Sequence, residues 1–320
     1  MHRPFQKTGC EGYEQAGLIK LFVSWEMLMQ TIFKYIREYL NMDRAGFSAY
    51  INASERAAQM WESGEAVPEI SVQTELCSIC KNNDVPVYEM TLNRIEETAA
   101  AVNAKTDRLV LYHGSKSGIE GNIKPKSRPQ CDFGSGFYMG TDPAQELTLI
   151  CDYDESKFYI TSLDAGGLAV ASIPADIDWA MLIACNRGRM ESIKGTPFYD
   201  KYKNMAKDSD VIAGSIANDR MFFVIDNFFM GNITDTAQVH SLSALKLGMQ
   251  YAAVSQKGCD AVRIECEIPV SHLERMFLKE EAEKNRETGI ASANEICRQY
   301  RREGLFFDEI IDRAALEADK

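Results

Sequence analysis

The chain has 320 residues, of which 45% are hydrophobic and 26% charged, and its formal net charge is −12. This length and composition are typical of a globular protein with one large domain or two ordinary ones. The negative charge argues against a protein that coats nucleic acid generally, while a local basic site stays compatible with it. No apolar run approaches the roughly 18 residues of a membrane span, and the N-terminus is polar, so we expect a cytoplasmic protein without membrane contact.

The nine cysteines follow no regular spacing, and an odd number favours reduced intracellular thiols over a disulfide framework. Cys77 and Cys80 form a Cys-x-x-Cys pair. A zinc site requires two more ligands at comparable spacing, and none of the four histidines lies near this pair. We therefore interpret both residues as buried helix thiols and expect no metal.

Residues 14–41 are predicted to form one or two helices, because apolar side chains recur three or four residues apart. Such a stripe is most simply part of a core. It comprises Leu18, Leu21, Phe22, Trp25, Leu28, Met29, Ile32, Phe33, Ile36 and Leu40.

Residues 42–64 resemble the helix-turn-helix of the Cro and phage-repressor family. In that motif a first helix ends at a tight turn, a serine caps the second helix, and a Trp-Glu-x-Gly segment closes it before a proline. Ser54 has the chemistry of an N-cap, Gly64 has that of a C-terminal stop, and Pro68 follows. These signals predict an all-helical fold for this part of the chain.

The same resemblance assigns DNA contacts to the second helix. Ser54, Glu55, Arg56 and Gln59 would read base edges, and Arg44 would contact a phosphate. Between residues 43 and 70, however, there are two basic and five acidic residues, whereas phosphate binding requires cations. A structural or protein-binding helical domain is therefore favoured over a DNA reader.

A helix is predicted over residues 91–104, and the polar segment 103–107 follows it. We place a domain boundary here. The prediction is an all-α domain at residues 1–104 and a second domain at residues 105–320.

The second domain begins with an apolar strand at residues 109–115, which ends in His113, Gly114 and Ser115. The end of this strand therefore offers three groups that can bind a ligand: a ring nitrogen, an unobstructed backbone and a hydroxyl.

In residues 132–142, two glycines precede the pair Phe137 and Tyr138. Glycine lets backbone or a flat ligand approach closely beside an aromatic face. This combination suits a planar ring.

The remaining elements alternate between strand and helix patterns. Asp142 and Pro143 are predicted to cap a helix that begins near Ala144. Strands are expected at 168–173, 211–216, 250–254 and 261–267, a turn at Lys257-Gly258, a helix at 178–187, and a charged helical tail at 271–320.

The two motifs, His-Gly-Ser and Phe-Gly-Ser-Gly-Phe-Tyr-Met, together resemble the NAD-binding core of the diphtheria-toxin and poly(ADP-ribose) polymerase class of ADP-ribosyltransferases. That class carries His, Tyr and Glu on three separate strands. The sequence is most similar to an uncharacterised bacterial branch in which the third residue is commonly Gln, here Gln250, with Gln238 and Gln256 as nearby alternatives. The resemblance spans residues 108–265 and implies an α+β domain with a split antiparallel sheet.

The resemblance also implies a role for each site residue. His113 would bond to the ribose on the adenosine side, Gly114 would meet the nicotinamide amide through its backbone, and Ser115 would support the ribose or the amide. Tyr138 would stack on the nicotinamide ring, and Gln250 would bond to the 2′-hydroxyl of the nicotinamide ribose.

Further residues complete the expected NAD site. Gly136 and Phe137 belong to the second motif, and the second Tyr of the polymerases falls near Leu149, with Tyr153 slightly beyond. The basic loop between the motifs would lie near the pyrophosphate, although such a loop is usually just solvated. Its cations are Lys116, Lys124, Lys126 and Arg128.

Gln250 is the main departure from the class. A glutamine carries no negative charge to favour a cationic transition state, and it is not a general base. Chain elongation is therefore not expected. Asp210 or Asp219 would supply a base if one is needed, although Asp219 is equally suited to cap a helix.

The sequence thus predicts NAD-dependent mono-ADP-ribosylation of an unknown protein or nucleic-acid acceptor, with an effector or toxin-like role as the expectation at the level of the family. The alternative is a non-catalytic regulator or scaffold that senses NAD and whose helix-turn-helix binds DNA or protein. A third interpretation is a catalytically dead member of the fold.

Overall fold

The computed structural model describes residues 31–216, 219–244 and 248–318. The chain divides into two units between Thr91 and Leu92, within a helix, which is earlier than the boundary expected at residue 104. The protein is α+β, as predicted, with helices in the first unit and a sheet with helices in the second. Of the predicted helical region 14–41, residues 14–30 lie outside the described residues.

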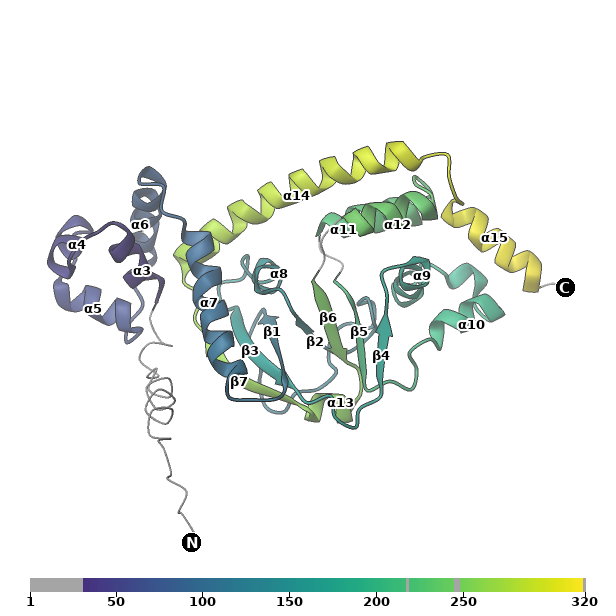
Figure 1. Ribbon diagram of the computed structural model, residues 1–320, viewed down its shortest axis with the longest axis horizontal. Helices are drawn as coiled ribbons and strands as arrows, with labels where there is room; N and C mark the ends of the chain where they lie inside the picture. Colours follow the sequence, from purple (N-terminus) through teal and green to yellow (C-terminus); the bar gives the residue numbers. More distant parts are fainter. Residues whose placement is uncertain (1–30, 217–218, 245–247, 319–320) are drawn as a thin grey trace, which may run out of the picture. The chain divides into compact units, whose positions relative to one another are not determined.

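The described part of the first unit consists of short helices (Figure 1). As predicted, the Ser54 hydroxyl caps a helix by accepting from the N–H of Ala57, and Gly64 ends that helix with a φ of 77°. The Cys77 and Cys80 thiols are buried within the following helix, as predicted. The helices are α3 (Ile32–Tyr39), α4 (Arg44–Tyr50), α5 (Glu55–Ser63) and α6 (Ile70–Asn82).

A buried carboxylate joins three helices of this unit. Glu62 on α5 accepts from Arg37 Nε on α3 at 2.6 Å and from Arg44 on α4 at 3.1 Å. Its side chain is 5% exposed. Because a buried charge requires pairing, Glu62 binds both guanidinium groups, that of Arg37 mostly buried and that of Arg44 at the surface.

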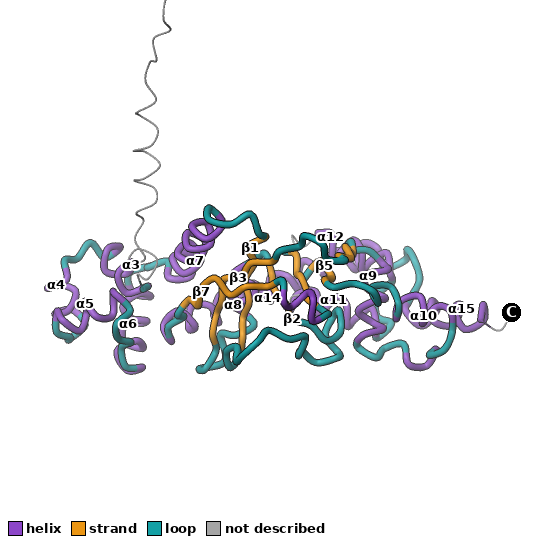
Figure 2. The backbone as a smooth tube through the Cα atoms, turned by 90° about the horizontal axis from the view of Figure 1, so that it is seen from below, coloured by secondary structure: helices purple, strands orange, loops and turns teal. Residues whose placement is uncertain are grey.

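The second unit is built on a seven-stranded sheet with the order β4-β5-β6-β2-β1-β3-β7. The β4–β5 pair is parallel and the other pairs are antiparallel. In Figure 2 the strands, in orange, lie together with helices around them. The strands are β1 (Leu109–Ser115), β2 (Phe137–Gly140), β3 (Lys157–Leu163), β4 (Val170–Ile173), β5 (Val211–Ser215), β6 (Met249–Ala253) and β7 (Val262–Ile268).

Helices cover the sheet, and α14 crosses beyond the strand ends in Figure 1. Within the described ranges, no helix combines the length and hydropathy of a membrane-spanning segment. The elements are α7 (Val87–Asn103), α8 (Pro143–Thr148), α9 (Ile177–Asn186), the 3-10 turn η1 (Glu191–Ile193), α10 (Pro197–Lys203), α11 (Asp219–Phe229), α12 (Asp235–Ala244), α13 (Gln256–Asp260), α14 (His272–Tyr300) and α15 (Phe307–Ala318).

The residues at the start of α8 predicted that helix correctly, whereas the segment of α13 was wrongly expected to be a turn. Asp142 caps α8 and Pro143 opens it, as predicted. The turn expected at Lys257-Gly258 is instead the short helix α13, because the Ser255 hydroxyl accepts from the Gly258 N–H and so caps a helical turn.

Apolar side chains pack on both faces of the sheet. Ile212 and Ala252 belong to a cluster with Trp179 of α9, whereas their neighbours Val211 and Ala253 belong to a separate cluster. Successive residues of a strand point to opposite faces, so the sheet lies between two cores.

The first prediction concerns Glu62. Replacing it by Ala leaves Arg37 and Arg44 without their shared partner, so we expect Glu62→Ala to lower the free energy of unfolding of the first unit by about 3–5 kcal/mol. Urea unfolding followed by circular dichroism measures this loss. Glu65→Ala, at an exposed position on the same segment, is the control. An equal effect of both substitutions would contradict the prediction.

Candidate functional site

The sheet opens between β1 and β2. Strand β1 pairs with β3 along its whole length, but the described strands β1 and β2 share one register pair, Tyr112 with Gly140. Continuing that antiparallel register would make Gly114 and Tyr138 the next hydrogen-bonded pair. Instead, the two strands separate at this position.

Two side chains bond to the backbone groups that the opening leaves without a strand partner. The Gly114 N–H donates to Glu146 Oε2 at 3.2 Å, and the Tyr138 carbonyl accepts from His113 Nδ1 at 2.6 Å. Buried backbone groups without partners cost free energy. His113 and Glu146 therefore allow the sheet to part without that cost.

A cavity of about 770 Å³ occupies the opening. Its lining includes every residue that the sequence nominated for the His-Tyr-Gln signature or for NAD binding, drawn from strands β1, β2 and β6 and from the segments beside them. These residues are His113, Gly114, Ser115, Gly136, Phe137, Tyr138, Leu149 and Gln250.

His113 presents one ring nitrogen as a hydrogen-bond acceptor. Its ring packs against Phe137, with centroids 4.2 Å apart, and against Tyr159 at 6.2 Å. Burial lowers the pKa of His113 to about 4, so the imidazole is neutral near pH 7. Because the Tyr138 carbonyl can only accept, Nδ1 carries the proton and Nε2 is left as the acceptor.

Tyr138 is held by its hydroxyl, which leaves the ring as a wall of the cavity. The hydroxyl donates to the Gly134 carbonyl at 2.7 Å and accepts from the Phe133 N–H at 3.0 Å. The Tyr138 and Phe133 rings lie 9° from parallel. Burial also raises the pKa of the hydroxyl, so it remains protonated.

The orientation of the Gln250 amide follows from its partners. Its Nε2 donates to Asp132 Oδ2 at 3.3 Å and to the Ser215 carbonyl at 3.1 Å. Both partners are acceptors, so the nitrogen must face them and Oε1 is left to accept from a ligand. The alternatives Gln238 and Gln256 lie on α12 and α13 and do not line the cavity.

Asp132 braces Gln250, a role that the sequence did not suggest. Its carboxylate accepts from Arg187 at 2.6 Å as well as from Gln250, and its carbonyl accepts from Asn186 at 2.8 Å. The next residue, Phe133, lies so close to β5 that a Cβ on Gly214 would meet its ring at 2.6 Å. The glycine-rich segment is thus fixed to the end of α9 and to the sheet.

Glu146 is the second residue that the sequence did not reveal. It is 6% exposed, and a Cβ on Gly140 would meet its Oε1 at 2.6 Å, so that glycine makes room for the carboxyl. Burial, with a smaller contribution from Asp142, raises the pKa of Glu146 to about 8. The carboxyl is therefore mainly protonated at pH 7. No local sequence signal distinguishes it from a solvent-exposed helix residue.

The cavity is cationic although the protein is acidic. Its lining includes Arg187, which pairs with Asp132, and four further cations from the loop between β1 and β2. Ile119 and Ile123 anchor this loop to an apolar cluster. The lining attracts an anion, because Glu146 is neutral and Asp132 is paired. The four loop cations are Lys116, Lys124, Lys126 and Arg128.

Leu149 lies where it was expected, whereas Tyr153 and Ser115 differ in detail from the expectation. Leu149 lines the cavity and is 52% exposed, whereas Tyr153 lies outside the lining, beneath Lys116, whose Nζ is 4.1 Å from the ring centroid. The second wall of the cavity is therefore aliphatic. The Ser115 hydroxyl already donates to the Gly118 carbonyl at 2.8 Å and retains acceptor capacity only.

The expectation that Asp210 could supply a base is wrong. Asp210 precedes β5 at the end of the strand away from Gly214, which pairs with Gln250. Its carboxylate accepts from the Ala169 N–H and from Lys257 and Ser255, and these bonds lower its pKa to about 2. Asp210 is a structural clamp. Asp219 is the first residue of α11, and its side chain lies outside the described residues.

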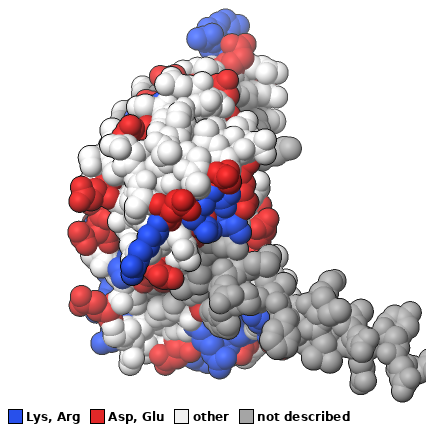
Figure 3. All heavy atoms as spheres, turned by 90° about the vertical axis from the view of Figure 1, so that its left-hand side faces the viewer, with Lys and Arg blue, Asp and Glu red and all other residues white. Residues whose placement is uncertain are grey.

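The nominated DNA contacts lie on α4 and α5. Glu55, Arg56 and Gln59 are exposed, while the Ser54 hydroxyl is used as the cap and Arg44 is paired with Glu62. On the face drawn in Figure 3, acidic and basic side chains of the described residues alternate without a continuous basic surface. This pattern does not favour phosphate binding.

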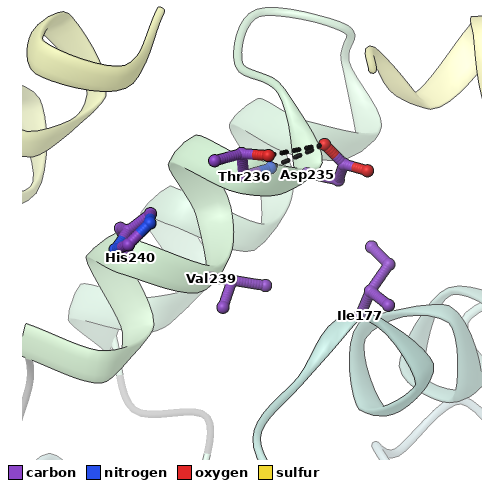
Figure 4. A pocket seen from close by; sticks show the side chains of 5 residues that line it. All are labelled: Ile177, Asp235, Thr236, Val239 and His240. Atoms are coloured by element: carbon purple, nitrogen blue, oxygen red, sulfur yellow. Dashed lines mark hydrogen bonds between the residues drawn. The ribbon is translucent and has the colours of Figure 1, made fainter. Parts of the chain in front are cut away.

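A smaller cavity of about 260 Å³ lies between α12 and the start of α9 (Figure 4). The Asp235 carboxylate on its wall accepts from Thr236 and from the Leu305 N–H, and the His240 ring stacks on Tyr300 with centroids 3.9 Å apart. Its polar groups are thus engaged within the protein. The larger cavity is the candidate site.

Glu146 generates a pH-dependent prediction. Its folded-state pKa, about 8, lies above the unfolded value of 4.5, so the folded protein binds this proton more tightly. Stability should therefore fall as the pH rises from 5 to 8, by up to about 1.4 kcal/mol per pH unit. Glu146→Gln keeps an acceptor for Gly114 but does not ionise, so we expect it to stabilise the protein more at pH 8 than at pH 5.

Thermal unfolding at both pH values measures this difference. Glu155→Gln, at an exposed position, is the control and should show no such change. A Glu146→Gln effect that is equal at pH 5 and pH 8 would mean that the carboxyl is ionised throughout.

Comparison with known proteins matches part of the chain to a family. Residues 109–264 match the family described as "Protein of unknown function (DUF3990)". No curated protein and no solved structure matches the chain. The matched segment runs from the first residue of β1 into β7, so it contains every residue that lines the larger cavity.

Proposed function

We propose that the second unit binds NAD and transfers a single ADP-ribosyl group to a macromolecular acceptor. The observation that carries the proposal is the meeting of His113, Tyr138 and Gln250 in one cavity. They lie on the adjacent strands β1, β2 and β6, where the sheet opens. The resemblance predicted a His, a Tyr and a Gln on three separate strands around NAD.

The fold is part of the same proposal. The ADP-ribosyltransferase class has a split antiparallel sheet, and here the β1–β2 register contains one pair at the opening. Hydrogen bonding nevertheless connects all seven strands into one sheet. The opening supports an ADP-ribosyltransferase-like arrangement of the second unit.

The cavity suits the chemical groups of NAD. Its volume of about 770 Å³ lies within the range of roughly 300–1,000 Å³ that is usual for ligand pockets. Tyr138 and Leu149 provide an aromatic and an aliphatic wall for a flat ring, and His113 Nε2 can accept from a ribose hydroxyl. The loop cations would neutralise the pyrophosphate.

The chain's own groups would hold NAD and stabilise charge. NAD supplies the ADP-ribosyl group as its bond to nicotinamide breaks through a positively charged transition state. Gln250 Oε1 would accept from the 2′-hydroxyl of the ribose, and the Asp132 carboxylate behind the amide would polarise it. Asp132 thus compensates in part for the charge that a glutamine lacks, although its pairing with Arg187 reduces that effect.

Mono-transfer is favoured over chain elongation. Gln250 is not a general base, and Asp210, one of the two expected substitutes, lies away from the cavity. The acceptor would have to attack without a proton-accepting group at the third position of the signature.

A regulator or scaffold that senses NAD without turnover is the second candidate. The uncharged Gln250 favours it, and the exposed Glu55, Arg56 and Gln59 of the first unit are its proposed contacts with DNA or protein. NAD binding without nicotinamide release, together with salt-dependent binding of duplex DNA, would favour this candidate.

Nicotinamide release from NAD tests the enzyme. We expect Tyr138→Ala to remove about 1–3 kcal/mol of stacking, and so to weaken NAD binding roughly tenfold or more. His113→Ala should lower release because it loses the ribose contact and frees the Tyr138 carbonyl. Gln250→Glu adds the negative charge that favours the transition state, but it also sets a carboxylate against Asp132 and the Ser215 carbonyl. We therefore expect release to rise when Gln250→Glu is combined with Asp132→Asn, which supplies a donor and removes the repulsion.

Two control variants distinguish the loss of the Tyr138 ring from a general disruption of the fold. Tyr138→Phe keeps the ring but loses the bonds to Phe133 and Gly134, so it should retain more NAD affinity than Tyr138→Ala. Tyr50→Ala removes an exposed tyrosine of the first unit and should leave NAD binding unchanged. Absence of both nicotinamide release and NAD binding by calorimetry in the wild type would refute the proposal.

A separate prediction tests the brace behind Gln250. Asp132→Asn keeps the shape of the side chain but loses the charge that binds Arg187 and fixes the Gln250 amide. We expect kcat for nicotinamide release to fall roughly tenfold with little change in KM, because the Gln250 contact matters most in the transition state. An unchanged kcat would show that Asp132 does not position Gln250.

A further inference from the structure

Glu146 is a buried acid that the proposed reaction does not use. Of the two acidic residues lining the cavity, Asp132 pairs with Arg187, whereas the carboxyl of Glu146 accepts from the backbone N–H of Gly114. Burying a carboxyl is costly unless it is neutral and hydrogen-bonded. Beyond its bond to Gly114, which keeps the sheet open, its place in the cavity lets the carboxyl meet a ligand.

The position of Glu146 brings it to the end of the cavity where the flat ring would bind. Gly114, its backbone partner, would pair with Tyr138 if the β1–β2 register continued, so Glu146 and Tyr138 line the same opening from its two sides. Tyr138 is the proposed stacking wall. The resemblance assigned the Gly114 backbone to the nicotinamide amide, but its N–H already donates to Glu146. A ligand amide would therefore meet the carboxyl beside Gly114.

A protonated carboxyl is complementary to a primary carboxamide, because each offers one hydrogen-bond donor and one acceptor side by side. Burial raises the pKa of Glu146 to about 8, so near pH 7 it carries an O–H donor and a carbonyl acceptor. The carbonyl oxygen has two lone pairs, and one of them suffices for the Gly114 N–H. A primary carboxamide offers the complementary C=O and N–H, so two hydrogen bonds can form side by side.

We infer that Glu146 is the specificity-determining residue of the cavity, and that its carboxyl pairs with the primary carboxamide at the nicotinamide end of NAD. This inference rests on the proposed function, because it assumes that NAD is the ligand. It adds a contact that the His, Tyr and Gln residues do not provide.

Three ligands and three forms of the full-length chain test the pairing by calorimetry. The ligands are NAD, its acetylpyridine analogue, in which a methyl group replaces the amide nitrogen, and ADP-ribose, which lacks the ring. The proteins are the wild type, Glu146→Gln and Glu146→Leu. Gln offers the same donor and acceptor pattern as a protonated carboxyl, whereas Leu offers neither.

We expect the wild type to prefer NAD over the acetylpyridine analogue by roughly tenfold, because the analogue leaves a buried acceptor unpaired. Glu146→Gln should keep this preference, and Glu146→Leu should reduce it to within about twofold. ADP-ribose should bind the wild type and Glu146→Gln alike, because Gln keeps an acceptor for the Gly114 N–H. Any loss of ADP-ribose affinity in Glu146→Leu measures the effect of the unpaired Gly114 N–H on the cavity, so the preference for NAD over its analogue is compared within each protein.

The outcomes separate this inference from the proposed function. Lack of a preference in the wild type, its loss in Glu146→Gln, or its retention in Glu146→Leu would each overturn the role of Glu146, while NAD binding itself would still stand. If Glu146→Leu fails to bind ADP-ribose, the role of Glu146 is judged from the preference for NAD over its analogue in the wild type and in Glu146→Gln. If the wild type binds none of the three ligands, both the inference and the proposed function fail.

Discussion

Two hydrogen bonds hold the sheet open, and the candidate site depends on them. Strands β1 and β2 part after Tyr112 and Gly140, and the backbone groups released there bond to the side chains of His113 and Glu146. Without such partners, the parting would expose backbone groups at a cost comparable to a lost hydrogen bond for each. The same two side chains line the cavity, so the residues that allow the sheet to open are also part of the candidate site.

The charged residues that line the cavity are mainly cations, although the net charge of the whole chain is negative. The net charge is −12, yet the cavity gathers cations from the loop after β1. Of its two acids, Asp132 is paired with Arg187 and Glu146 is mostly neutral near pH 7. The cavity thus keeps a local positive potential suited to a phosphate-bearing ligand. Such a potential draws an anionic ligand to one place without making the entire surface bind nucleic acid.

The neighbours of Gln250 fix the orientation of its amide. An isolated glutamine can rotate its amide to suit any partner, but the Asp132 carboxylate and the Ser215 carbonyl both require the nitrogen. The oxygen is therefore presented to the cavity. The glycine-rich segment that carries Asp132 also holds the Tyr138 hydroxyl, so the aromatic wall and the amide are fixed by one piece of chain.

Local features could be predicted from the amino-acid sequence: the caps at Ser54 and Asp142, the α+β class, and the residues of the two motifs that line the cavity. These features depend on short-range chemistry and on the periodicity of a single strand or helix. The folded chain was needed to show that Glu146 and Asp132 belong to the site and that Asp210 does not. Strand order across more than a hundred residues sets those distances, and burial sets the protonation of Glu146; neither is encoded in a local pattern.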